Sequence, residues 1–321
     1  MPIKQFPVTD LDFGDIKSAI KDYYKRSEGP FKDFDFEGSG LSLILDILAH
    51  NTHYNAVLAH LAANETFISS AQMRKNVVAR AKALGYTPHG VGAPSATVTL
   101  VGLPSSIVSL PEGTTFTSTD TLNNTTYTFS TIEEIANPTG EFAIYQGSYQ
   151  TQTYAFDDKV KNLKFEIPNK NVDITKIQVV VRDSATSTKK EIYTQFSELP
   201  GITGTSAIYF INENPNGFYE IAFGDNVLGK KPAPASQVEI KYFTTKGTEG
   251  NGLSTFSVSD SIFNGAIVNV VASNSSSGGG VKEGIESIRQ NAPLQLLSQN
   301  RAVTVDDYVA LVRKNANVKD V

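Results

Sequence analysis

The chain has 321 residues, a formal net charge of -5 at pH 7 and no cysteine. The absence of cysteine excludes disulfides, thiolate metal sites and cysteine nucleophiles. Charges of both signs are interspersed, so no positive field attracts a polyphosphate backbone, and we expect no nucleic-acid partner. The sequence contains no run of 18 or more apolar residues and no signal-peptide pattern at its start, so we expect no membrane contact and no export.

Residues 12 to 86 have the spacing of helices. The run "SGLSLILDILAHNTHYNAVLAHLAANETF" predicts a helix from about Leu41 to Asn64, with Ser39 as its cap. This helix is apolar around much of its circumference, which a solvent-facing helix would not tolerate. Its apolar residues are Leu43, Ile44, Ile47, Leu48, Tyr54, Leu58, Leu61 and Ala62. We expect other helices to cover it, and the predicted partner-helix face is Leu43, Ile47, Tyr54, Leu58 and Leu61.

Two more helices are predicted on either side of it. "SSAQMRKNVVARAKALGYTP" places Ser69 or Ser70 at a helix start, Gly85 at the left-handed position that ends a helix, and Pro88 beyond it. "DFGDIKSAIKDYYKRS" supplies the third helix. Because three helices rich in small residues have no large domain of their own, we predict a bundle that partner chains complete.

From about residue 93 to residue 272 the pattern changes to period two with turn residues. "ATVTLVGL", "TTYTFST", "KIQVVVRD", "AIYFINE", "FYEIAFG" and "QVEIKYFTT" are β-branched and aromatic runs bounded by turn residues. They predict a mostly antiparallel β domain. Asn216-Gly217 is a hairpin signal, so the strand before Asn212 is predicted to return through Phe218 to Phe223.

The stretch "FGDNVLGKKPAPASQVEIKYFTTKGTEGN" resembles a ligand-cradling loop in composition. Turn chemistry explains it without a ligand, because Asp225 is able to bond nearby backbone amides and the prolines stiffen the connection to the next strand.

The last part of the chain is predicted to be a hinge followed by helices. "SNSSSGGGVKEG" favours mobility, so we predict a hinge at residues 273 to 280. A helix from Ile285 to about Asn291 then meets Pro293, which suits the first turn of a following helix. "RAVTVDDYVALVRKNA" has a capping-box pattern, and the final "NVKDV" resembles the beginning of an edge strand. We therefore expect the polypeptide to continue beyond this sequence.

This division gives an α+β chain in three parts. Residues 1–90 are a helical assembly segment, residues 91–272 a β-rich domain, and residues 273–321 the hinge and a C-terminal helical segment.

Candidate chemistry is sparse. His50, His53 and His60 share one side of the long helix with Asp46 and Asn64, but a polar packing stripe explains them better than a metal. The glycines before Lys282 lack the P-loop pattern, because Glu283 follows that lysine. The carboxylate pairs are adjacent in sequence and do not face one another. We expect no enzyme, no catalytic residue, no metal site and no cofactor.

Several stretches, in order, resemble the J-like baseplate proteins of contractile-tailed bacteriophages and related injection machines. They are "ETFISSAQMRKNVVARAKALGYTPHGVGAPSATVTL", "LPEGTTFTS", "TYTFST", "YEIAFGDNVLGKKPAPASQVEIKYFTTKGTEGN" and "GGGVKEGIESIRQNAPLQLLSQNRAVTVDDYVALV". The β part of the motif comprises Phe223, Gly224, Asp225, Gly229, Gly247 and Asn251. The helical part comprises Arg289, Pro293, Arg301, Thr304, Asp307 and Tyr308. The long helical segment before them is most similar to the baseplate wedge proteins of T-even-type phages.

That resemblance implies a structural role in the virion. The chain would form a homodimer, bundle its N-terminal helices with other wedge subunits, link neighbouring wedges into the ring around the hub, and transmit shape change on contraction. It would be assembled in the host cytoplasm and reside in the tail baseplate. Members of the family continue past the length of this chain.

The alternative is a carbohydrate-binding or hydrolytic tail module. Such a module needs an aromatic platform or paired carboxylates, and the chain has no tryptophan. Sugar-array binding is the measurement that separates the two functions.

Overall fold

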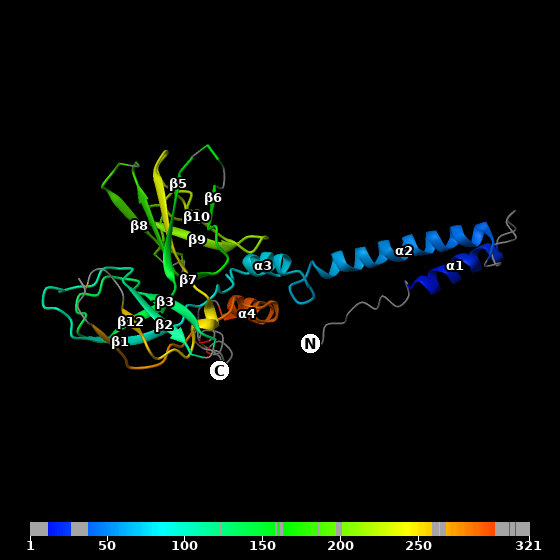
Figure 1. Cartoon of the computed structure of the whole chain (residues 1–321). Coiled ribbons are helices and arrows are strands. Elements are labelled where there is room, and N and C mark those ends of the chain that lie inside the picture. Colours follow the sequence, from blue (N-terminus) through cyan, green and yellow to red (C-terminus); the bar gives the residue numbers. More distant parts are fainter. Residues whose placement is uncertain are drawn as a thin grey trace. The chain divides into compact units, whose positions relative to one another are not determined.

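The computed structural model describes residues 12–26, 38–121, 123–157, 159–160, 163–184, 186–196, 201–258, 263, 268–298, 308 and 312. Two compact units share the chain, Met1–Arg80 and Ala81–Val321. The first unit holds long helices, and the second holds the described strands and one further helix (Figure 1). The expected order of a helical N-terminal region, a β-rich region and a C-terminal helix is confirmed. The 80/81 division differs from the boundary predicted at 90.

Helices α1 (Phe13–Arg26) and α2 (Gly40–Asn64) lie alongside each other (Figure 1). Ser39 is the cap of α2, as predicted: its Oγ accepts a hydrogen bond from the Ser42 N–H at 3.0 Å. The pairing is antiparallel, because Lys17 forms an ion pair with Asp46 at 2.5 Å and Phe13 meets the ring of His50 edge-on. This pairing places α1 over one side of α2.

Helix α3 (Arg74–Ala83) begins later than the sequence suggested. The prediction that Ser69 or Ser70 caps it is wrong, since the Ser70 hydroxyl donates instead to the carbonyl of Asn64. Glu65 takes the capping role: its carboxylate accepts hydrogen bonds from the N–H groups of Gln72 and Met73, just before the first turn. A carboxylate is favoured at that end of a helix by the unpaired N–H groups and the helix dipole.

The end of α3 follows the prediction. Gly85 has φ +78°, its N–H donates to the carbonyl of Lys82, and the N–H of Tyr86 donates to the carbonyl of Ala81. These two bonds are those of a Schellman motif, in which a residue in the left-handed region ends the helix.

The first sheet has six strands in the order β12-β2-β3-β4-β1-β13, all paired antiparallel. They are β1 (Ser95–Val101), β2 (Thr115–Asp120), β3 (Thr125–Ser130), β4 (Phe142–Gln146), β12 (Ser257–Val258) and β13 (Asn269–Ala272). The end strands β12 and β13 contact each other, so the sheet curls around its own core. Alternate residues of its strands, including Val98, Phe116, Phe129 and Ile144, point into that core.

The second sheet has seven strands in the order β5-β11-β7-β8-β9-β10-β6. They are β5 (Ser148–Ala155), β6 (Lys164–Glu166), β7 (Val172–Arg182), β8 (Lys190–Gln195), β9 (Ile208–Glu213), β10 (Tyr219–Phe223) and β11 (Gln237–Thr244). The described pairings are antiparallel except that of β8 with β9. The Tyr154 hydroxyl of β5 donates to the carbonyl of Glu166 in β6, so the two end strands approach each other.

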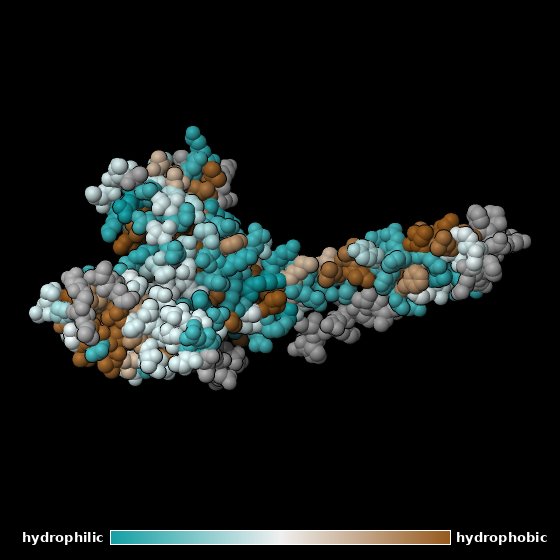
Figure 2. Space-filling view, viewed as in Figure 1, coloured by the Kyte–Doolittle hydropathy of each residue, from teal (hydrophilic) through white to brown (hydrophobic). Residues whose placement is uncertain are grey.

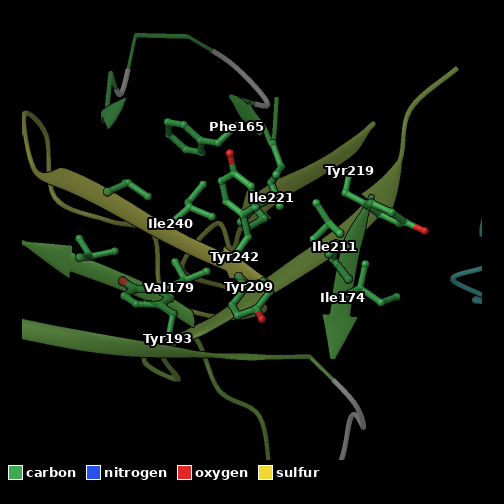
Figure 3. Packing of buried hydrophobic residues seen from close by; sticks show 14 of the residues in the cluster. Phe165, Ile174, Val179, Tyr193, Tyr209, Ile211, Tyr219, Ile221, Ile240 and Tyr242 are labelled. Carbon is green, nitrogen blue, oxygen red and sulfur yellow. The ribbon is translucent and has the colours of Figure 1, made fainter. Parts of the chain in front are cut away.

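Tyrosine and aliphatic side chains make up much of the core enclosed by the second sheet. Tyr193, Tyr219, Ile221 and Ile240 are among the fully buried side chains of its core (Figure 3). The β region therefore contains two curled sheets with separate cores, where the sequence had suggested one domain.

A single glycine connects the two sheets. Gln146 ends β4, Ser148 begins β5, and Gly147 between them has φ +130°. A Cβ at this position would collide with the carbonyl oxygen of Thr244, so both the backbone angle and the space require glycine.

The predicted hairpin is confirmed. β9 and β10 pair antiparallel, with Tyr219 opposite Glu213, and Gly217 in the turn has φ +84°. The next strand along the chain, β11, does not pair with β10 but lies between β5 and β7. Strands with similar local patterns therefore occupy different places in the sheet.

The predicted hinge at residues 273 to 280 is held by hydrogen bonds. Ser277 exchanges backbone bonds with Ser95, and Gly280 exchanges them with Gly92. The buried Ser276 hydroxyl donates to the carbonyl of Gly250 and accepts from the N–H of Leu253. A mobile linker would not make such regular bonds to both neighbouring segments. These contacts therefore do not favour the predicted hinge, which stays a prediction.

Helix α4 (Ile285–Ser298) contains Pro293 in its interior. The prediction that this proline opens a new helix is wrong. A proline inside a helix removes one backbone hydrogen bond and crowds the preceding turn. Ile288 and Ala292 are fully buried on this helix, and we attribute its continuity through Pro293 to that packing.

Candidate assembly surface

An apolar stripe runs along α2. At about 100° per residue, Leu43, Ile47, Tyr54, Leu58 and Leu61 fall within roughly 60° of one another around the helix. Leu43 is 62% exposed, Ile47 61% and Tyr54 59%, and the apolar surface of α2 is visible in Figure 2. Leu61 is half-buried. These are the residues predicted to face a partner helix, and the other described helices of the first unit leave most of their surface uncovered.

The opposite side of α2 is packed. Ser42, Leu45 and Ala49 are its buried residues. The antiparallel α1 contacts α2 at Asp46 and His50, which lie between this side and the stripe. The helix therefore has one face used within the chain and one left apolar at the surface. Ile44, Leu48 and Val57 are also exposed and widen the stripe.

The stripe has the spacing of a helix-helix seam. Ile47, Tyr54 and Leu61 are seven residues apart, and Leu43 precedes Ile47 by four. Apolar residues at alternating spacings of three and four meet a neighbouring helix along one line when two helices cross at a small angle. The spacing of the stripe is therefore that of residues in helix-helix contacts.

The polar residues of α2 do not form a metal site. Asp46 is engaged by Lys17 and His50 stacks edge-on against Phe13, with ring centroids 6.4 Å apart. Among the described residues there is no group of three or more His, Asp or Glu side chains placed to hold a metal ion.

The turn after β10 is built from the residues of the predicted β motif. The Asp225 carboxylate accepts hydrogen bonds from the N–H groups of Val227 and Leu228, both at 2.9 Å, and these bonds lower the pKa of that carboxyl. Gly229 has φ +82°, and a Cβ there would lie 2.5 Å from the Ile208 side chain. Gly224 lies against the carbonyl of Gly229 in the same turn. The stretch is explained by turn chemistry, as the sequence indicated.

Phe223 anchors that turn to the core of the second sheet. Its ring meets the rings of Phe156, Phe165 and Tyr193 at centroid distances of 6.3, 5.7 and 5.1 Å. Aromatic clusters of this kind bury a large apolar area and fix the strand end in place.

The second half of the β motif joins distant segments. The side-chain amide of Asn251 donates to the carbonyl of Gly279 and accepts from its N–H, at 3.1 and 2.9 Å. Gly247 begins the short 3-10 helix η3 (Gly247–Gly250), and Thr245 before it donates to the Gln146 side chain at 2.7 Å. These residues fasten the end of β11 to β4 and to the segment before α4.

The helical motif is only partly described. Arg289 contacts Glu286 on α4 at 2.6 Å, and Tyr308 is exposed. Arg301, Thr304 and Asp307 lie outside the described residues, as does the predicted final edge strand.

Sequence reasoning missed Glu283. This buried carboxylate accepts hydrogen bonds from the Tyr86 hydroxyl, the His89 N–H, the Ser287 hydroxyl and the Asn291 amide, at 2.7, 2.9, 2.7 and 3.1 Å. Burial and then the Glu283 charge raise the pKa of Tyr86. The network ties α4 to the chain segment that follows α3. A lone glutamate at a helix start gives no sequence signal for partners almost two hundred positions away.

The described helices include none with the length and apolar content that a membrane crossing requires.

Two comparisons with known proteins find similarity to baseplate wedge proteins. Residues 12–86 match a family described as the helical domain of gp6-like baseplate wedge proteins. The chain is 28% identical, over 334 aligned positions, to baseplate wedge protein gp6 of Enterobacteria phage T4. The alignment covers 94% of this chain and 49% of that protein, so the chain spans about half the length of the relative it matches.

A solved structure is also similar. It is the cryo-EM structure of the six-fold-symmetrised baseplate of the anti-feeding prophage, with 13% sequence identity and a TM-score of 0.35. The match covers 97% of this chain and 65% of that chain.

Proposed function

We propose that this chain is a structural subunit of a contractile-tail baseplate wedge and that the α2 stripe is its contact with the helices of other wedge subunits. The single observation that carries the proposal is the exposed stripe itself. It lies on the longest helix of the segment that is similar to wedge-protein helical domains. A chain that bundles its helices with partners needs an apolar helix face that its own fold leaves open.

The magnitudes support an interface rather than a solvated face. Covering a half-exposed Leu or Ile side chain contributes about 1 kcal/mol, taken as about half of the full burial value. Leu43, Ile47 and Leu58 are each 46% to 62% exposed, so a partner helix would gain roughly 3 kcal/mol from these three alone. This free energy would offset part of the translational and rotational entropy that the two chains lose on association.

The finer assignments rest on the same proposal. The chain forms a homodimer, contacts neighbouring wedges in the ring, resides in the virion tail baseplate after assembly in the host cytoplasm, and transmits shape change on contraction. The role is structural, with no catalytic residue proposed.

The test places charge on the stripe of the full chain. The variant carries Ile47→Glu and Leu58→Glu, and the control carries Thr52→Glu, at an exposed position of α2 outside the stripe. We expect the wild type and the control to show oligomers by light scattering and the double variant to show a monomer. Circular dichroism should be the same for all three, because the altered side chains are exposed in the single chain.

Two outcomes would overturn the proposed contact. One is a wild-type chain that stays monomeric at every concentration, alone and when co-expressed with the other wedge subunits. The other is a double variant that associates as strongly as the control.

A further inference from the structure

The strands of the six-stranded sheet are almost free of charge. Among their residues the only charged one is Asp120, the last residue of β2, at the hairpin end opposite Thr125. In the seven-stranded sheet, by contrast, every strand except β5 carries charged residues. Cross-strand ion pairs join them, such as Lys164 with Glu220 at 2.7 Å and Arg182 with Glu239 at 2.9 Å. The two sheets therefore have different exteriors.

The outward side of strands β2, β3 and β12 in the six-stranded sheet is lined with threonine and serine hydroxyls. Phe116 and Phe129 point inward, so the alternate residues of β2, β3 and β12 point outward. We call this set the hydroxyl face: Thr115, Thr117, Thr119, Thr126, Thr128 and Ser257. Thr119, Thr126, Thr128 and Ser257 are exposed, and Thr115 and Thr117 are half-buried.

The hydroxyls already pair with one another. Thr119 Oγ1 and Thr126 Oγ1 are 3.0 Å apart, and Thr117 Oγ1 and Ser257 Oγ are 2.9 Å apart. Burying a polar group is costly when it loses its hydrogen bond, and less so when its partner is buried with it. This face therefore loses little when water is removed, and it has no charge to desolvate.

We propose that the hydroxyl face packs against the hydroxyl face of a second copy of this chain. In a two-fold symmetric contact each residue near the axis meets its own counterpart, so any charge there faces a like charge. The whole chain carries a net charge of -5, which opposes approach of two copies over most of the surface. Two copies that meet through the uncharged hydroxyl face avoid this like-charge repulsion. The inference rests on the proposed homodimer and names the surface that takes part in it.

The contact is small. Strands β2 and β3, about 4.8 Å apart and with six residues each at about 3.3 Å, give roughly 10 Å by 20 Å, and the two residues of β12 add roughly 30 Å², so the face covers about 230 Å². A standard stable interface buries about 800 Å² on each partner. The hydroxyl face therefore acts where two copies are already held together, since tethering turns a weak contact into an effectively intramolecular one.

The absence of cysteine from the chain allows a direct test. Single-cysteine variants Thr117→Cys and Thr128→Cys report on the face, and Thr194→Cys, at an exposed position of β8, is the matched control. Each full-length variant is treated with a short bismaleimide, and the rate of covalent dimer formation is measured. We expect dimers from the two face variants to form about tenfold faster than from the control, and Thr126→Lys added to Thr128→Cys to abolish the difference.

A second arm separates this inference from the proposed function. The cysteine variants are repeated with Ile47→Glu and Leu58→Glu. If the face variants cross-link faster than the control, and this difference falls when the α2 stripe is disrupted, the hydroxyl faces meet in copies that α2 holds together. Equal rates for the face and control variants overturn the inference even if the wild type associates through α2. A Thr128→Cys thiol that is protected from labelling only when other wedge subunits are present, without dimer formation, also overturns it.

Discussion

Helix α2 and the two sheets use the same residue types in opposite ways. Ile47 of α2 is 61% exposed, whereas Ile240 of β11 is fully buried among tyrosine and valine side chains (Figure 3). Each sheet curls around its own core, so its apolar residues stabilise the fold of the single chain. The apolar stripe on α2 does not have that role. The buried aliphatic residues therefore stabilise the fold of the single chain, and the proposed function assigns the exposed ones to association.

The largest expected effect separates these two roles with one residue type. Ile240→Ala should lower the free energy of unfolding by about 2–5 kcal/mol, because it removes buried methylenes and leaves a cavity. Ile47→Ala should change it by less than about 0.5 kcal/mol in the monomer, since the side chain is already exposed. Urea denaturation followed by circular dichroism at low protein concentration measures both.

Equal losses for the two variants would contradict the comparison, because they would mean that Ile47 is buried in the single chain in solution.

A smaller effect tests whether buried polar groups also stabilise the second unit. Glu283→Ala should destabilise it by about 1–3 kcal/mol, because the Tyr86 hydroxyl, the His89 N–H and the Asn291 amide lose their acceptor. Glu286→Ala on the same helix is the matched control, since Glu286 is exposed and bonds only to Arg289 among its described contacts. Its effect should be below about 0.5 kcal/mol. Hydrogen exchange of residues 84–92 should rise in the first variant alone.

If exchange rises equally in both variants, the helix start rather than the buried network holds that segment.

The smallest effect concerns one hydroxyl in the second sheet. The Tyr193 hydroxyl is buried and has no hydrogen-bond partner among the described residues. Burial, and then the nearby Glu191, raise the pKa of Tyr193 from 10 to about 12. The neutral form is thus favoured in the fold, so its contribution is present below pH 10 and is lost as pH rises through about 12.

Tyr193→Phe should therefore change stability at pH 7 by less than about 1 kcal/mol, and it should reduce the loss of stability between pH 10 and 12. Thermal unfolding across that pH range measures the change. A large loss at pH 7 would mean that the hydroxyl has a partner, such as an ordered water.

Three local signals in the sequence predicted the local structure correctly. The Ser39 cap, the end of α3 at Gly85 and the hairpin at Asn216-Gly217 each depend on residues close together in the chain. The apolar residues of α2 could also be read from the sequence, and that they face a partner helix stays a prediction. In contrast, β5 reads as "SYQTQTYA", which has no apolar alternation, and it is a strand because β11 pairs with it along its full length.

The rest was set by contacts between distant segments. Pro293 stays inside α4, where Ile288 and Ala292 are buried, and Glu283 finds its acceptor role only when the segment after α3 is in place. Nothing in the sequence divides the β region into two sheets, because the change of sheet occurs within one continuous extended stretch at Gly147.

That single glycine has a mechanical consequence. A linker of several residues would let one sheet absorb a pull before its neighbour felt it, but one residue between β4 and β5 has no slack. Since β11 leads back to β4 through the Thr245 and Gln146 side chains, the junction is braced on two sides. A force applied to one sheet is therefore transmitted directly to the other through the backbone at Gly147, because the connection is too short to extend.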